Sequence, residues 1–203
     1  FGPMQSVWTR RAGIEVGARR SPVAALPRVH QIILPTPWES GYVQVYLIEG
    51  EPLTLVDTGV RSAESRSVLE SSLSELGYGL EEIERVVVTH YHRDHMGQVE
   101  SIRRGAGSLE VCAHENGVAM IEGFSSERDA NIAGTSALFR DYGVPGDVLE
   151  RMNERRWEQL RTEPALAEPT RVDRRLRDGE SIAFKDFAFE VIHAPGHTAG
   201  DIL

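Results

Sequence analysis

The feature that most constrains this chain is a cluster of metal-binding side chains that directly follows a run of three valines. The valines are residues 86–88, and the cluster consists of His90, His92, Asp94 and His95. A β-branched run is typical of a buried strand, and a strand that ends in a polar loop holds that loop still. Alternate residues of an extended segment point the same way, so His90 and His92 can face one cation. Imidazole and carboxylate groups bind zinc and related divalent metals, and the sequence therefore predicts a metal site.

Two distant segments add to this prediction. Asp57 ends the apolar stretch 53–56, and His197 follows the Pro-Gly turn of the segment 194–200. Asp57 either caps the next turn or orients a metal-bound histidine by accepting its other ring N–H. His197 supplies a third imidazole, and three protein ligands with an open position are the pattern of catalytic zinc.

The H-x-H-x-D-H segment at 90–95, the strand end at 55–59 and the G-H-T segment at 196–198 resemble the motifs of the metallo-β-lactamase superfamily, in the same order. The resemblance extends along most of the chain. It implies that His90, His92 and His197 bind a first metal and that Asp94 and His95 contribute to a second. It also implies that Asp94 is catalytic and that Asp57 supports the ligands from behind. The expected cofactor is zinc, two ions in the complete protein, with iron or manganese as alternatives.

The coarse pattern predicts an α/β fold. Strands are expected at 42–48 and 109–113 and a helix at 62–76, in the order β-β-α-β-α-β, which suits a mixed sheet covered by helices. The resemblance makes this a metallo-β-lactamase-like αββα sandwich with mixed sheets. We expect one domain over residues 4–203, with residues 1–3 as a remnant of an expression tag.

A helical insertion is predicted at about 114–162, where strand signals stop. One helix is expected at about 126–142 and a second at about 146–160. In the first helix the residues expected to face inward are Ala130, Ala133, Ala137 and Leu138. In the second, the residues that fall on related faces are Leu149, Met152, Arg156 and Leu160. The insertion either serves packing and dimerisation or forms a wall over the metal site.

The remaining histidines, His30, His114 and His193, are expected at the surface or at strand ends rather than as ligands. The superfamily normally supplies a bridging aspartate and a final histidine after the G-H-T motif, but this chain ends at Leu203. Asp201 lies too near His197 to match the bridging aspartate. We therefore expect the C-terminal part of the domain to be missing.

Composition limits the partners. The net charge of −9 argues against nucleic acid as a partner, because nucleic acid is itself polyanionic. One cysteine, Cys112, excludes an internal disulfide framework and fits a reducing compartment. No stretch is apolar for long enough to span a membrane. We expect a cytoplasmic protein with a small-molecule substrate, and we keep a homodimer as an open alternative to a monomer.

The function that the resemblance implies is a metal-dependent hydrolase, which uses a metal-activated water on a small ester, thioester or lactone. A metal-dependent endoribonuclease and an iron-dependent sulfur dioxygenase are the alternatives, because relatives of both kinds use a similar histidine loop. A binding module that keeps its metal for stability is the non-enzymatic alternative.

Overall fold

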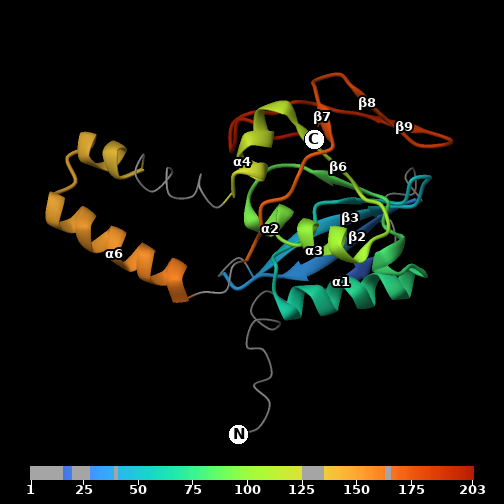
Figure 1. Cartoon of the computed structure of the whole chain (residues 1–203), viewed down its shortest axis with the longest axis horizontal. Coiled ribbons are helices and arrows are strands. Elements are labelled where there is room, and N and C mark those ends of the chain that lie inside the picture. The colour runs from blue at the N-terminus through green and yellow to red at the C-terminus, as the bar shows by residue number, and fades with distance from the viewer. Residues whose placement is uncertain (1–15, 20–27, 39–40, 125–134, 163–165) are drawn as a thin grey trace, which may run out of the picture.

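The computed structural model describes residues 16–19, 28–38, 41–124, 135–162 and 166–203. In these ranges seven strands form one mixed sheet, whose strand order follows the chain (Figure 1). Strands β1 to β4 pair antiparallel, and β4 to β7 pair parallel. The strands are β1 Gly17–Arg19, β2 Val29–Pro35, β3 Tyr42–Ile48, β4 Thr54–Val56, β5 Arg85–Val88, β6 Glu110–His114 and β7 Arg174–Leu176.

Most of the helices cover one face of this sheet, and a small second sheet lies over the other (Figure 1). The helices are α1 Ala63–Leu76, α2 Arg93–Met96, α3 Val99–Gly105, α4 Val118–Glu122 and α6 Gly146–Thr162, with short 3-10 turns η2 Leu80–Glu82 and η3 Glu115–Gly117. The second sheet pairs β8 Ser181–Ala183 with β9 Ala188–Glu190, antiparallel. The predicted mixed α/β fold is confirmed.

Helix α1 begins and ends where its sequence provides caps. The Ser62 hydroxyl accepts a hydrogen bond from the Ser65 N–H, which satisfies a donor that the first turn leaves free. Gly77 closes the helix with φ 95°, a left-handed conformation that glycine adopts without a steric penalty. These two residues place the helix within one residue of its predicted start and at its predicted end.

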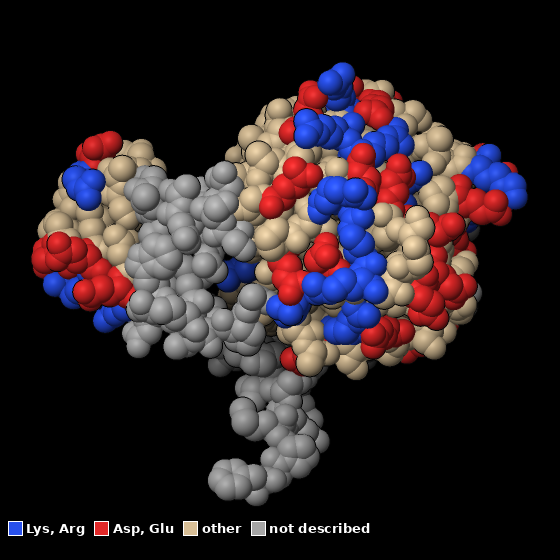
Figure 2. Space-filling model, in the orientation of Figure 1, with Lys and Arg blue, Asp and Glu red and all other residues tan. Residues whose placement is uncertain are grey.

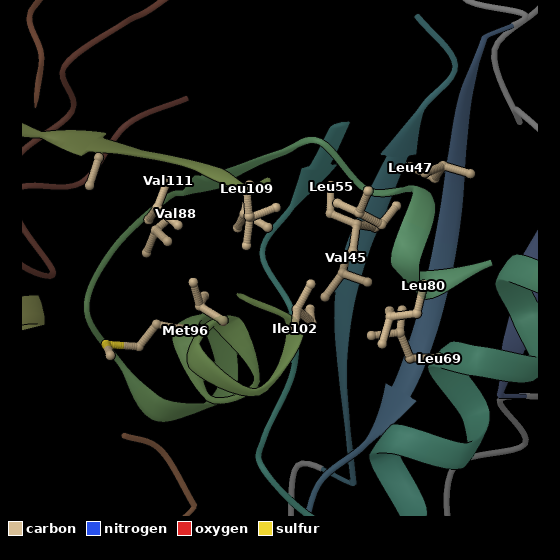
Figure 3. Close-up of a cluster of buried hydrophobic side chains, with 14 of the residues drawn as sticks. Val45, Leu47, Leu55, Leu69, Leu80, Val88, Met96, Ile102, Leu109 and Val111 are labelled. Carbon is tan, nitrogen blue, oxygen red and sulfur yellow. The ribbon is translucent and has the colours of Figure 1, made fainter. Parts of the chain in front are cut away.

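The core is divided between the two faces of the sheet by strand alternation. Val86 and Val88 pack in the cluster under the helices, whereas Val87, between them, packs in the cluster under β8 and β9. Met96 and Ile102 reach from α2 and α3 into the helix-side cluster (Figure 3). Strand β5 is therefore buried on both faces, which explains its continuous run of valines.

The helical insertion departs from the prediction in its details. Residue 114 still belongs to β6, and the described helical residues of the insertion include 135–141 and α6, which project from the sheet (Figure 1). Leu149 is buried, whereas Met152, expected on a related face of α6, is 44% exposed. In the preceding helical segment Ala137 is exposed and Leu138 is 49% exposed. The prediction that Ala137 and Leu138 face inward is wrong, because the projecting helical segment leaves them without a core to join. The predicted positions 126–134, and the side chains at 156 and 160, lie outside the described residues.

Two of the histidines outside the motifs lie at or next to strand ends. His30, the second residue of β2, is only 3% exposed, and its Nε2 lies 3.0 Å from Glu49 Oε1. His30 is therefore buried rather than at the surface, and it lies near the start of β2, the other of the two places expected for it. His114 is the last residue of β6, at a strand end as expected. No helix in the described ranges is both long and apolar enough to cross a bilayer.

Gly97, between α2 and α3, provides a test of how tightly this region packs. A Cβ atom there would lie 2.4–2.6 Å from the carbonyl oxygens of Arg93, Leu166 and Gly59. Backbone cannot yield as a flexible side chain does, so Gly97→Ala is expected to lower the free energy of unfolding by about 1–3 kcal/mol. Chemical denaturation measures this loss.

The matched control is Gly105→Ala at the end of α3, where a Cβ would meet nothing within 4 Å. This change should leave stability equal or slightly raised, because alanine restricts the unfolded chain. Equal stability of the two variants would contradict the packing that we describe around Gly97.

Candidate metal centre

The predicted site residues lie at one edge of the main sheet. Because β2 is antiparallel to β3 and β3 to β4, the strands β2, β4, β5, β6 and β7 all run in one direction. Their carboxyl ends therefore meet at the same edge. The loop 36–41 follows β2, Asp57 follows β4, and the histidine loop 90–95 follows β5. Sheets of this kind place ligands at this edge.

Three histidines converge there. The ring nitrogens of His90, His92 and His197 lie within 4.8 Å of one another, and His92 Nδ1 is 2.8 Å from His197 Nε2. The Nε2 atom of His90 is buried and has no hydrogen-bond partner. A buried nitrogen without a partner is costly, and a metal ion beside it would satisfy its lone pair. The structure thus brings together the three predicted first-site residues in an arrangement that fits a divalent ion.

Burial favours the neutral form of His90 and His92. The pKa of His90 is lowered to about 4, mainly by desolvation and then by the neighbouring His95 ring. Desolvation also lowers the pKa of His92, with an additional contribution from His197. A neutral imidazole offers the lone pair that a metal ion binds, whereas a protonated one does not.

Asp57 organises the residues behind the histidines. Its Oδ1 accepts from the Thr89 N–H (2.8 Å), and its Oδ2 from the Thr89 hydroxyl (2.7 Å) and His95 Nδ1 (2.7 Å). The residue is 4% exposed and has φ 61°, a left-handed conformation that non-glycine residues rarely adopt. Strain of this kind persists only where surrounding contacts fix it. The hydrogen bond from His95 is the contact that the orienting role of Asp57 predicts, and the binding of a metal by His95 stays a prediction.

Asp94 and His95 lie beside the histidine trio. A carboxylate only accepts hydrogen bonds, so the proton of this contact is bound to His95 Nδ1, which donates the hydrogen bond to Asp57. The Nε2 atom of a neutral His95 ring is then available as an acceptor. That Nε2 lies 3.5 Å from Asp94 Oδ2. Burial lowers the pKa of His95, but the hydrogen bond to Asp57 and its charge outweigh burial and raise it. The two residues predicted for a second metal therefore present their polar atoms together.

Asp201 was assigned no role from the sequence, yet it shapes the turn that carries His197. Its carboxylate accepts from the N–H (2.6 Å) and the hydroxyl (2.7 Å) of Thr198. Burial raises the pKa of Asp201, but these two hydrogen bonds lower it below its usual value. Asp201 Oδ1 also lies 4.0 Å from His90 Nδ1. The Thr-x-x-Asp spacing was a usable signal, since a carboxylate three residues away can close such a turn.

A second contact that the sequence did not reveal holds the same turn. The rings of His114 and His193 stack with centroids 3.8 Å apart and planes at 9°. His193 Nε2 lies 2.9 Å from the Ala199 carbonyl, which it can reach as a donor. Close by, a Cβ on Gly200 would lie 2.6 Å from the Gly117 nitrogen, so the turn packs directly on η3. The loop with His197 is therefore attached to the end of β6 on two sides.

Comparison with known proteins places this site in a family. The profile of the metallo-beta-lactamase superfamily matches residues 38–203. The probable metallo-hydrolase YqjP of Bacillus subtilis (strain 168) is 29% identical over 174 residues, which are 85% of this chain and 51% of that protein.

Solved structures agree. A metallo-beta-lactamase family protein of Thermus thermophilus superposes with TM-score 0.67 and 27% identity, over 88% of this chain and 56% of that one. A subclass B3 metallo-beta-lactamase of Bradyrhizobium japonicum, BJP-1, superposes with TM-score 0.56 and 21% identity, over 86% of this chain and 52% of that one, and shows likeness of fold. The chain thus spans about half the length of these relatives. It belongs to the metallo-beta-lactamase superfamily.

Proposed function

We propose that this chain carries the metal centre of a hydrolase that acts on a small ester, thioester or lactone. The observation that carries the proposal is the convergence of three imidazoles, one with a buried unpartnered Nε2, at the carboxyl edge of the sheet. His90, His92 and His197 would hold the first ion. Asp94 and His95 would serve a second, with zinc as the expected metal. When bound, a divalent ion polarises a substrate carbonyl and makes water acidic enough to attack at neutral pH.

The chain's own residues would prepare this reaction in three ways. Asp57 fixes the His95 ring with the proton on Nδ1, so that Nε2 faces the site. Asp94 Oδ2, beside that nitrogen, is placed to help hold the second ion or to position the attacking water. Thr198 and Asp201 hold the turn that presents His197.

Charge supports a small-molecule substrate over RNA. The chain has net charge −9, and Figure 2 shows acidic and basic side chains interspersed over the visible face. An RNA-cutting enzyme usually carries a continuous basic surface for the phosphate backbone. A cytoplasmic location, suggested by the single buried Cys112, and a homodimer both stay predictions.

Elemental analysis of the full protein, followed by a panel of thioester, lactone and RNA substrates, tests the proposal. We expect bound zinc and turnover of at least one ester-like substrate that ends when a chelator removes the metal. Bound iron with oxygen-dependent sulfur oxidation would instead identify a dioxygenase, and cleavage of RNA alone would identify a nuclease. Firm metal binding without any turnover would favour a binding module.

The first-site ligands can be tested by metal stoichiometry. His92→Ala and His197→Ala should each reduce the metal retained after dialysis, because a three-imidazole site loses a third of its donors. His30→Gln is the control, since His30 is equally a histidine but lies near the start of β2, at the opposite edge. Retention unchanged in both site variants would remove these residues from the ligand set.

Asp94 is expected to serve catalysis rather than folding. Asp94→Asn keeps the shape of the side chain but loses its charge, so turnover should fall by about 10²–10⁴-fold. The melting temperature should move little, because the Asp94 side chain is 31% exposed. Asp186→Asn, an exposed aspartate paired with Arg28 far from the site, is the control. Full activity of the Asp94 variant would exclude the role.

A further inference from the structure

Arg93 occupies a position in the histidine loop that the proposed chemistry does not use. It stands between His92 and Asp94 and is the first residue of α2. Its guanidinium carbon lies 5.1 Å from the centroid of the Trp38 ring. Trp38 belongs to the loop that follows β2, and this loop lies at the same sheet edge as the three histidines. Both side chains are partly buried.

The guanidinium of Arg93 differs from comparable groups in this protein. Within the described residues it makes no ion pair and no hydrogen bond, although it is partly buried. Each of the other described arginines that is buried or partly buried has a carboxylate within 4.0 Å. These are Arg61, Arg66, Arg85, Arg103 and Arg174. A charge partly removed from water without a partner is costly, so its retention beside the site requires a reason.

The contact with Trp38 leaves the recognition groups of Arg93 free. Cation–π contact uses the flat face of a guanidinium, while its N–H donors lie around the rim. Those donors match the two oxygens of a carboxylate or phosphate in a fork-like, bidentate geometry. Trp38 therefore acts as a support that limits the movement of Arg93 without competing for its hydrogen bonds.

We propose that Arg93, supported by Trp38, is an anion-binding subsite that selects substrates with a carboxylate or phosphate group near the scissile bond. The selection of substrates rests on the hydrolase function proposed above. The binding of an anion by Arg93 does not depend on that function. Arg28 provides a matched control. It contacts Phe187 in the same cation–π manner, at 5.6 Å, but precedes β2 and so lies at the opposite sheet edge.

Anion binding by the metal-free full protein tests the subsite directly. Glutarate and inorganic phosphate are titrated separately by calorimetry, which also tells a carboxylate site from a phosphate site. Arg93→Met should weaken binding of the preferred anion about ten- to a hundredfold, since charge-assisted bonds are lost. Arg93→Lys should fall between, because lysine keeps the charge without the fork. Arg28→Met should bind as the unchanged protein does. Equal affinity in Arg93→Met, or no binding of either anion to the unchanged protein, would overturn the proposal.

Metal-loaded protein then separates selection from general damage. The para-nitrophenyl esters of valerate and of glutarate differ in a terminal methyl against a carboxylate. Arg93→Met should lower kcat/KM for the glutaryl ester about ten- to a hundredfold, mainly through KM, and leave the valeryl ester within about twofold. An equal loss for both esters would show a structural role and contradict the proposal. Trp38→Ala should reproduce part of the selective loss, whereas Trp38→Phe should retain the support.

The two experiments distinguish the two proposals. If the protein hydrolyses neither ester but binds an anion through Arg93, the subsite stands and the hydrolase function fails. If it hydrolyses both esters with no dependence on Arg93, the hydrolase function stands and the subsite is overturned.

Discussion

The hydrogen bonds of the Asp57 carboxylate are the interactions on which the rest of the site depends. Asp57 joins three elements that are distant in sequence, because it follows β4, receives two hydrogen bonds from Thr89 after β5 and receives a third from His95 in α2. The next residue adds to this connection, since Thr58 donates its N–H and its hydroxyl to the His95 carbonyl. Several charge-assisted bonds converge on one buried group, which offsets the cost of its left-handed backbone. Its geometry therefore determines where the histidine loop lies.

Close backbone packing also fixes the elements around the site. Gly97 brings α2 against the carbonyl of Gly59, and Gly200 brings the turn of His197 against η3. The stacked His114 and His193 rings reinforce the second contact. His90 and His92 are thus positioned from β5, while His197 is positioned from β6 across the edge of the sheet. Site geometry of this kind requires rigid elements rather than flexible loops.

The sequence predicted the elements whose signals are local. Strand β3 was predicted with its observed bounds, and α1 to within one residue, because alternation, Ser62 and Gly77 act over a few residues. The convergence of His197 with the histidine loop also followed from the motifs. What the sequence could not supply were contacts set by tertiary packing. The roles of Thr89 and Asp201, the burial of His30 and the exposure of Leu138 depend on which elements lie alongside, and no local pattern encodes that.

Charged groups at this edge of the sheet act on a ligand over short distances only. The net charge of −9 is therefore a weak guide to which ligands the site accepts. Screening at physiological salt reduces the influence of exposed charges beyond about 8 Å, so the total charge says little about what this site accepts. Close to the centre, the carboxylates of Asp57 and Asp201 are already occupied by hydrogen bonds from Thr89, His95 and Thr198. The guanidinium of Arg93 has no such partner among the described residues and is adjacent to the ligands in sequence. The total charge of the chain therefore says little about which charged groups a substrate would meet at this edge, where the guanidinium of Arg93, unpaired within the described part of the chain, and the partly exposed carboxylate of Asp94 are neighbours in sequence.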